Sequence, residues 1–335
     1  MMARHPFSPL LFCILLLCVA AVRSQTPVGR VVRPNAVWHT VTDLDRTVAF
    51  YRDAVGLVPE PAPAGPPSDV SAVLGTPGAT MRTATLSIPG ADVRLTLAQF
   101  SGITGAPVRQ RLQDPGSVKL VIRVRDMDAA FARVQSRVAL VYTDGGRPMK
   151  PEGPAAVNQA VIMRDPDGYP LEFALQGTPP IAADVPAASN IVSGWATFIV
   201  GDVDASIEFY RTLLDFQVVS APRPLTQAAL TLQGTPHALG SMSAGLRPPG
   251  AVNTWRMYDF RGVDRARLVS RLQDPGATAV SFSVDDVKVL LTRMNAASGV
   301  SPEIGPARIN GRTRAFVRDP NGLLIGFVED ATPSK

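Results

Sequence analysis

The strongest constraint on the fold of this chain is that its sequence repeats. Four short motifs occur twice, in the same order and at a nearly constant offset. The pairs are residues 43–52 and 202–211, 75–77 and 234–236, 111–116 and 271–276, and 164–168 and 318–322. The third pair, Arg-Leu-Gln-Asp-Pro-Gly, is identical in both copies. Such an ordered recurrence indicates one structural unit present twice, so the two halves should fold alike.

The repeat also sets the expected domain boundaries. A chain of 335 residues usually forms two domains. The two copies predict one domain over residues 30–176 and a second over residues 190–330. Residues 177–189 between them are rich in Pro and Ala and show no hydrophobic periodicity, which is typical of a linker.

Each copy contains a weaker repeat of its own. Residues 37–42 have the pattern of a short strand, and Asp43 then opens an amphipathic helix. Residues 120–126 are followed by a helix in the same way. The aspartate at each helix start suits an N-cap, where a carboxylate accepts hydrogen bonds from unpaired backbone N–H groups. Strand pairs follow, one of them joined by a turn at residues 165–168. The unit of a strand, a helix and about three strands occurs four times, which predicts an α+β fold.

Residues 1–24 differ from the rest of the chain. Arg4 and His5 precede an apolar run at residues 10–22, and Ser24 follows as a small residue at a plausible cleavage site. This pattern is typical of a secretory signal peptide, and the run is short for a membrane span. We therefore expect a secreted or periplasmic protein, with a membrane anchor as the alternative.

Cysteine content and charge exclude several classes of protein. Cys13 and Cys18 both lie in the expected signal peptide, so the mature chain would have no disulfide and no thiolate ligand. The formal net charge of +5 is mild, and no basic block or basic-aromatic stripe is present, so we expect no nucleic-acid partner. No membrane partner is expected after signal removal. The chain also lacks a phosphate-binding Gly loop and a nucleotide fingerprint.

The repeated motifs resemble those of the vicinal oxygen chelate superfamily, which includes glyoxalase I, bleomycin-resistance proteins and extradiol dioxygenases. Residues 43–57 and 164–173 carry the resemblance, and their copies at residues 202–216 and 318–327 support it. The resemblance covers nearly all of the mature chain. It implies four βαβββ modules, paired into two domains whose cupped mixed sheets curl around a cavity.

The resemblance also implies where a divalent metal would be held. Superfamily enzymes place a His at the start of a module's first strand and a Glu on its last strand. The matching positions here are Ala36, Lys119, Trp195 and Ala279 on first strands, and Thr96, Glu172, Arg256 and Gly326 on last strands.

Only Glu172 among these eight residues is a metal ligand of that kind, and one carboxylate holds a divalent ion weakly. We therefore expect no cofactor. His39 is the one nearby histidine, and side-chain alternation along its strand places it on the helix side. The alternative is that a β-bulge turns His39 into the cavity, where His39 and Glu172 would be half of a Zn²⁺, Mn²⁺ or Fe²⁺ site.

Polar and aromatic residues on the cavity face are the candidate ligand-binding groups. In the first domain, Lys119, Arg123 and Glu172 are expected to face the cavity, where two cations suit a carboxylate or a phosphate. A solvated rim or an internal ion pair is the alternative. In the second domain the matching residues are Trp195 and Arg256, which suit a flat or mixed ligand and suit core packing equally well.

Three functions remain open from the sequence. The first is an exported protein that binds a small organic molecule without the usual metal. The second is a metal-dependent lyase or isomerase, or an extradiol-type dioxygenase with an atypical site. The third is a structural module whose cavities have filled with side chains. The superfamily runs many reactions and some members only bind, so the fold does not decide between them.

Overall fold

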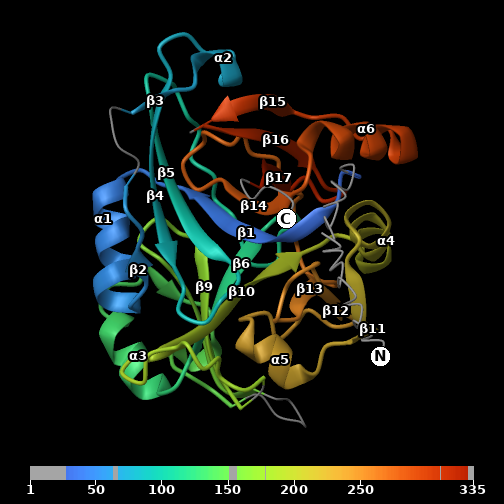
Figure 1. Ribbon diagram of the computed structural model, residues 1–335. Helices are drawn as coiled ribbons and strands as arrows, with labels where there is room; N and C mark the ends of the chain where they lie inside the picture. The colour runs from blue at the N-terminus through green and yellow to red at the C-terminus, as the bar shows by residue number, and fades with distance from the viewer. Residues whose placement is uncertain (1–27, 63–66, 151–156, 178, 310, 331–335) are drawn as a thin grey trace, which may run out of the picture. The chain divides into compact units, whose positions relative to one another are not determined.

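The computed structural model describes residues 28–62, 67–150, 157–177, 179–309 and 311–330 (Figure 1). The predicted signal peptide lies outside these residues. None of the helices in the described ranges is long and apolar enough to cross a membrane.

Four modules follow one another along the chain, and we number them 1 to 4. Module 1 contains β1 (Val31–Thr40), α1 (Leu44–Ala49) with its π-helical continuation η1 (Phe50–Val55), β2 (Val58–Pro59), β3 (Ser68–Asp69), α2 (Ser71–Leu74), β4 (Thr80–Ser87) and β5 (Arg94–Ser101). Module 2 contains β6 (Val118–Val124), α3 (Met127–Val134), β7 (Leu140–Val141), the 3₁₀ turn η2 (Asp144–Gly146), β8 (Val157–Arg164) and β9 (Pro170–Gln176).

The second copy repeats this plan. Module 3 contains β10 (Ile191–Ile199), α4 (Val203–Leu214), β11 (Gln217–Pro224), α5 (Gln227–Leu232), β12 (Met242–Arg247) and β13 (Trp255–Asp259). Module 4 contains β14 (Thr278–Val284), α6 (Val287–Ser298), β15 (Ile304–Ile309), β16 (Arg312–Arg318) and β17 (Leu324–Glu329).

An aspartate caps the main helix of every module. The Asp43 carboxylate accepts a hydrogen bond of 3.0 Å from the backbone N–H of Arg46. The carboxylates of Asp126, Asp202 and Asp286 accept equivalent bonds at the starts of α3, α4 and α6. These bonds satisfy N–H groups that have no partner within the helix, so the predicted N-caps are confirmed.

The strands form two large mixed sheets. The nine-stranded sheet has the order β15-β16-β17-β14-β1-β5-β4-β2, with β3 paired to β4. The eight-stranded sheet has the order β11-β12-β13-β10-β6-β9-β8-β7. The predicted α+β fold with four modules and cupped mixed sheets is confirmed.

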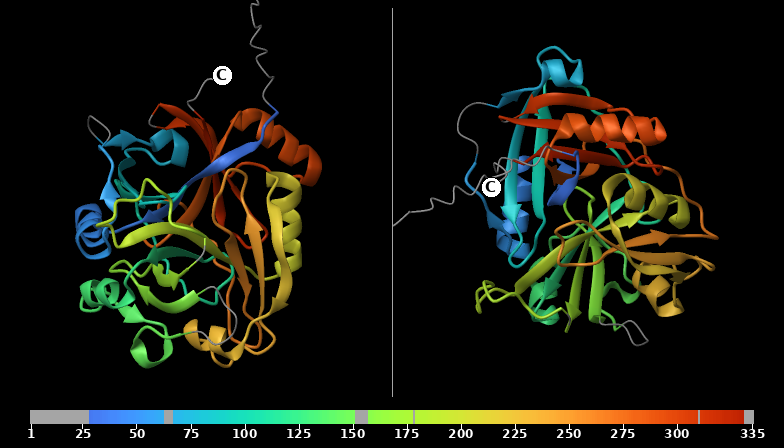
Figure 2. Two further views of the ribbon diagram at one scale, coloured as in Figure 1. Left: turned by 60° about the horizontal axis from the view of Figure 1, so that its bottom comes forward. Right: turned by 45° about the vertical axis from the view of Figure 1, so that its right-hand side comes forward.

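Each sheet nevertheless takes one half from each copy of the repeat. In the nine-stranded sheet β1 runs antiparallel to β14, with Val37 opposite Val280. In the eight-stranded sheet β6 runs antiparallel to β10, with Leu120 opposite Ala196. Figure 2 shows the first and last modules (blue and red) in one sheet and the two central modules (green and orange) in the other. The prediction that each copy curls around its own cavity is therefore wrong.

The modules of one copy are joined by other contacts. Helix α3 packs on η1 in the first copy, and α6 packs on α4 in the second. The Tyr51 hydroxyl donates a hydrogen bond of 2.9 Å to Asp165 in the turn of module 2, and Tyr210 donates to Asp319 in the same way. All four first strands have similar apolar patterns, so strand pattern alone does not determine which first strand pairs with which.

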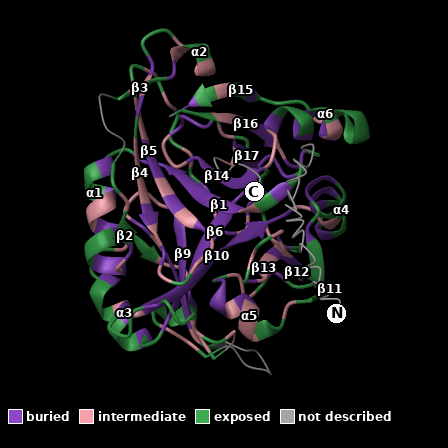
Figure 3. Ribbon diagram, in the orientation of Figure 1, coloured by how far each residue is buried: buried purple, intermediate pink, exposed green. Residues whose placement is uncertain are grey.

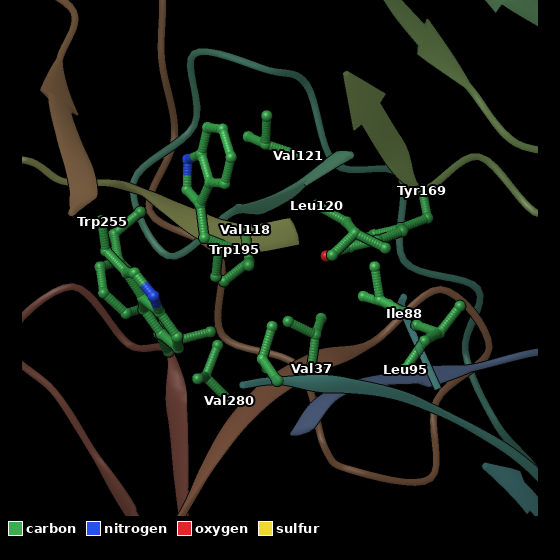
Figure 4. Packing of buried hydrophobic residues seen from close by; sticks show 14 of the residues in the cluster. Val37, Ile88, Leu95, Val118, Leu120, Val121, Tyr169, Trp195, Trp255 and Val280 are labelled. Carbon is green, nitrogen blue, oxygen red and sulfur yellow. The ribbon is translucent and has the colours of Figure 1, made fainter. Parts of the chain in front are cut away.

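The main core lies where the two sheets face each other. It includes Val37 and Val280 from one sheet and Val118 and Leu120 from the other (Figure 4). The central strands β6, β10 and β14 are buried along their whole length, whereas the edge strand β11 is largely exposed and the helices expose one side to solvent (Figure 3). The other face of each sheet, which is turned away from this core, carries the candidate sites.

Candidate functional site

The two sheets each have a face turned away from the main core. We call the face of the nine-stranded sheet that carries Ala36 and Trp38 the outer cup, because it belongs to the first and last modules. The face of the eight-stranded sheet that carries Lys119 is the inner cup.

The eight positions of the expected metal ligands divide between these faces. Strand register places Ala36, Thr96, Ala279 and Gly326 in the outer cup, and Lys119, Glu172, Trp195 and Arg256 in the inner cup.

A buried ion pair occupies the inner cup. The Nζ atom of Lys119 lies 2.5 Å from Oε2 of Glu172 and donates a second hydrogen bond of 3.0 Å to Oε1 of Gln233. The same Nζ lies 5.3 Å from the centre of the Tyr258 ring, within cation–π range. Lys119 has no solvent exposure, and burial lowers its pKa while the Glu172 carboxylate opposes that change. The Lys119 ammonium group therefore has three partners, which are the Glu172 carboxylate, the Gln233 side-chain carbonyl and the Tyr258 ring.

Helix α5 lines the same face and adds apolar side chains to it. Leu230 and Leu232 of this helix are buried, and Gln233 follows directly. The structure thus favours the alternative of an internal ion pair for Lys119 and Glu172 over that of an open anion site.

The other predicted ligand-binding residues lie in different surroundings. Trp195 is buried opposite Val121, on the far side of its strand from Val37 and Val280 (Figure 4). Arg256 is half-buried on β13, in register with Thr197.

Arg123 points to the linker between the copies. Its guanidinium donates hydrogen bonds of 3.0 Å to the carbonyl of Gln176 and 2.5 Å to the carbonyl of Pro179. Gln176 is the last residue of β9, and Pro179 lies in the connecting segment that follows it. Arg123 therefore anchors the linker and is not brought together with Lys119 and Glu172.

His39 lies on the helix side of β1, as alternation predicts. It is completely buried, its ring stacks on Tyr169 at 4.7 Å, and its Nε2 lies 3.8 Å from a carboxylate oxygen of Asp165. Neither ring nitrogen has a hydrogen-bond partner in the described part of the chain. Glu172 faces the inner cup, where it is bonded to Lys119, whereas His39 lies on the core side of β1, so the alternative pairing of these two residues around a metal is not formed.

The outer cup contains an open cavity of about 230 Å³, and a larger one of about 450 Å³ lies beside Arg123 and Arg125. The polar lining of the outer-cup cavity is rich in arginine and threonine, and Trp38 and Met81 supply apolar wall. The lining residues are Asn35, Ala36, Trp38, Glu60, Pro61, Met81, Thr83, Thr85, Arg94, Thr96, Ile309, Arg312 and Arg314. This cavity is open because small residues occupy the positions of the expected metal ligands. Ala36 and Thr96 in module 1 correspond to the larger Trp195 and Arg256 in module 3.

Arg314 is the unusual residue of this cavity. Its side chain is half-buried, and its Nε is buried with no hydrogen-bond partner in the described ranges. Burial, with repulsion from Arg312 in second place, lowers the pKa of Arg314 to about 10. The one carboxylate in the lining, Glu60, lies 3.7 Å from Arg94 and accepts a hydrogen bond of 2.7 Å from Ser87. Arg314 therefore remains a cation without a carboxylate partner among the described residues.

Arg314 is at none of the eight positions that match the superfamily's metal ligands, so the ligand spacing does not point to it. The sequence does contain one signal for this residue. Arg312 and Arg314 are two positions apart in a strand, so their side chains lie on the same face, and the strand continues into the buried residues 315–317. Two cations on the same face of a half-buried strand require an explanation.

The residues of the outer cup do not fit a divalent metal. Of the four ligand positions, only Thr96 has a side-chain oxygen, and that oxygen lies 3.4 Å from the Thr85 hydroxyl. A Cβ built on Gly326 would lie 2.8 Å from the Phe316 ring, so the space of a ligand there is filled. Across the described ranges, no group of three or more His, Cys, Asp or Glu side chains could hold a metal ion.

The comparisons with known proteins agree with this architecture. A 133-residue part of the chain, 39% of its length, is 27% identical to a lactoylglutathione lyase of Haemophilus influenzae and spans 87% of that protein. Glyoxalase I from Zea mays has a similar structure, with a TM-score of 0.59 and 18% identity over 90% of this chain and 92% of that one. A putative dioxygenase from Bacillus subtilis gives a TM-score of 0.57 and 14% identity, over 90% of this chain and 86% of that one.

A family model decides the classification. The model of the Glyoxalase/Bleomycin resistance protein/Dioxygenase superfamily matches residues 33–173 and again residues 193–327. The two matches coincide with the two copies of the repeat. The chain is therefore a member of the Glyoxalase/Bleomycin resistance protein/Dioxygenase superfamily.

Proposed function

We propose that this protein binds a small organic anion in the outer cup, without the divalent metal of the superfamily enzymes, and that it does so outside the cytoplasm. The observation that carries the proposal is the buried, unpartnered Nε of Arg314 beside a cavity of about 230 Å³. The basic and apolar pattern of residues 1–24 supports export.

Electrostatics make an anion the natural occupant. The Nε–H group of Arg314 is held away from water without a partner, so it loses hydration and gains no hydrogen bond in exchange. A carboxylate or phosphate would restore the missing hydrogen bonds, and a guanidinium binds such groups through two parallel N–H···O contacts. Arg312 adds a second positive charge at the same cavity. The threonine hydroxyls of residues 83, 85 and 96 offer further hydrogen bonds.

The size of the cavity limits the ligand. Sites for drug-sized molecules are commonly about 300–1,000 Å³. A cavity of about 230 Å³ lies below that range, so an organic acid of a few carbons is the better fit.

The similarity to a lactoylglutathione lyase favours a second candidate, a metal-dependent lyase. Residue chemistry opposes it, because Ala36, Ala279 and Gly326 have no donor side chain and Glu172 is already bonded to Lys119. The binding proposal is therefore preferred.

Titration of the purified protein with acetate and with inorganic phosphate at fixed ionic strength tests the proposal. We expect saturable binding of at least one anion to the wild-type protein and its loss in Arg314→Met. Arg82→Met is the matched control, since Arg82 is exposed on β4, is not part of the cavity lining and pairs with Asp45 at 2.9 Å. Failure of both anions to bind, or equal binding by Arg314→Met, would refute the proposal.

A further inference from the structure

An open cavity of about 450 Å³ lies where the linker crosses the end of the eight-stranded sheet. Strands β6, β8, β9 and β10 supply most of its wall, and Gly177 and Ile181 of the linker supply the rest. Sites for drug-sized molecules are commonly about 300–1,000 Å³, so this cavity is large enough for such a ligand. It is separate from the outer cup, whose lining belongs to the nine-stranded sheet and its loops.

Two arginines supply the charge of this cavity. Arg123 is only 3% exposed, and its Nε–H and one terminal N–H donate to the backbone carbonyls of Gln176 and Pro179. Arg125 follows two positions later and donates a hydrogen bond of 2.9 Å to the backbone carbonyl of Ser189. All three acceptors are uncharged. Among the described residues, neither guanidinium forms an ion pair with a carboxylate.

The two positive charges are close enough to affect each other. Burial lowers the pKa of the Arg123 guanidinium, and repulsion from Arg125 lowers it further. A guanidinium has five N–H donors, so three of those on Arg123 remain without a partner in the described part of the chain. An anion in the cavity would accept such N–H groups and offset the repulsion between the two cations.

The rest of the wall determines which kind of anion fits. Val124, Leu175, Ile181 and Val192 add apolar surface beside the two arginines. A ligand with an apolar body is stabilised by covering this surface, because apolar area is then removed from water. Acetate and phosphate have no such body, so we expect them to bind here weakly.

From this arrangement we infer that the protein has a second anion site, whose ligand is a drug-sized organic anion with one acidic head group and an apolar body. The head group pairs with Arg123 and Arg125, and the body lies against the apolar wall formed by the sheet and the linker. The linker is thereby part of a binding site, since Arg123 holds its start at Pro179 and Arg125 holds its end at Ser189. This inference does not depend on the anion site proposed for the outer cup.

Naphthalene-2-sulfonate is a suitable probe, because it combines one sulfonate with a rigid apolar body. Isothermal titration of the purified protein should show saturable binding of this probe. Methanesulfonate has the same head group without the body, and 2-naphthol has the body without the charge. Each should bind at least roughly tenfold more weakly than the probe. Absence of saturable probe binding, or equal binding by either of these two molecules, would overturn the inference.

Three arginine variants locate the head group. Arg125→Met should weaken probe binding by roughly tenfold or more. Arg133→Met is the matched control, because Arg133 is also exposed and also donates to a backbone carbonyl, that of Asp53 at 2.7 Å, but does not line the cavity. Arg314→Met should bind the probe as the wild type does. Loss of binding in Arg314→Met and its retention in Arg125→Met would place the probe in the outer cup and refute the second site.

A charge placed in the linker tests the apolar wall. Ile181→Asp brings a negative charge into the cavity and should abolish probe binding. Ala183→Asp is the matched control, because Ala183 is exposed on the same linker and does not line the cavity. Thermal melts check that the variants fold, and Arg125→Met at its exposed position provides the test if Ile181→Asp does not. Undiminished probe binding by a folded Ile181→Asp protein would contradict the inference.

Discussion

Lys119 and Glu172 form a buried ion pair with an Nζ–Oε2 distance of 2.5 Å, at two of the eight positions where the superfamily would place metal ligands. The side chain of Lys119 has no solvent exposure, and that of Glu172 has 11%. An internal cation thus lies where an enzyme of this superfamily would hold a metal, and the carboxylate that could bind a metal is already neutralised. The two cups therefore differ, because a pair of charges fills one and small residues leave the other open.

The first prediction concerns this pair. Glu172→Gln leaves the Lys119 ammonium buried without its countercharge, and breaking a buried pair from one side typically costs about 3–5 kcal/mol. We expect a loss of that order in the free energy of unfolding, measured by urea denaturation. The double variant Lys119→Met/Glu172→Leu should recover much of it, since both charges are removed together. A loss below 1 kcal/mol in Glu172→Gln would show that the pair does not matter for stability.

The second prediction is that Arg314→Met raises stability in the absence of ligand. The substitution removes a cation whose Nε is buried and unpartnered, and Met keeps most of the apolar stem. We expect a gain of about 1 kcal/mol in the free energy of unfolding. Arg82→Met should leave stability nearly unchanged, because exposed ion pairs contribute little. A destabilised Arg314→Met protein would indicate that Arg314 has a structural role.

Much of the fold could be predicted from the sequence, because the repeat, the Asp caps and the turn at residues 165–168 are local signals. The pairing of modules could not. Val37 and Val280 are neighbours across the nine-stranded sheet, yet nothing in either apolar strand distinguishes that pairing from one within a copy. The contacts that join the two modules of a copy, such as α3 on η1, are between residues far apart in sequence.

The candidate site shows the same division. The side of the strand that Lys119 and His39 occupy followed from alternation. The partner of Lys119 depended on the parallel register of β6 and β9, which brings Val121 beside Glu172. The surroundings of Arg314 could not be predicted from the sequence, because its cavity is lined by residues from both ends of the chain, which β1 and β16 bring into one sheet.

A third prediction concerns His39, whose counterpart in the second copy is Phe198. Both ring nitrogens of His39 are buried without hydrogen-bond partners in the described structure, while its ring stacks on Tyr169. His39→Phe keeps the stacking and removes the unsatisfied polar atoms, so we expect a stability gain of about 1 kcal/mol. Chemical denaturation measures it. His39→Ala is the comparison that leaves a cavity, and it should destabilise. A lower free energy of unfolding in His39→Phe would mean that the contact of His39 with Asp165 contributes more to stability than burial of the two unpartnered nitrogens costs.

The fourth prediction is a pH dependence centred on Asp165. Burial raises the pKa of this carboxyl above its ordinary value, against opposing contributions from His39, the Tyr169 backbone N–H and the Tyr51 hydroxyl. A raised folded-state pKa gives stability that is present below the unfolded pKa of about 3.9 and is lost as pH rises through the folded value. The stability of wild type relative to Asp165→Asn should therefore fall as pH rises from about 4.

Asp114 provides the control of opposite sign. Its contacts with Arg111 and with the Ala266 backbone N–H outweigh burial and lower the pKa of its carboxyl. The stability of wild type relative to Asp114→Asn should therefore rise with pH toward about 4 and stay constant above it. Urea denaturation of wild type and both variants between about pH 3 and 7 measures these two stability differences as a function of pH. If both differences changed with pH in the same direction, the opposite pKa shifts of Asp165 and Asp114 would be contradicted.

The last prediction is that the protein has no tight divalent-metal site. Thr96 supplies the single oxygen at the ligand positions of the outer cup, and Glu172 in the inner cup is paired with Lys119. Titration with Zn²⁺, Mn²⁺ or Fe²⁺ should leave thermal stability unchanged, whereas a metal at about 100 times its dissociation constant would add roughly 2.7 kcal/mol. Purification without chelator, followed by metal analysis, checks the same point independently. Stoichiometric metal that survives dialysis would overturn the prediction and favour a metal-dependent enzyme, and loss of that metal in His39→Ala or in Glu172→Ala would identify the residue that binds it. The outer cup would then be a second, separate site, because Arg314 and Glu172 belong to different sheets.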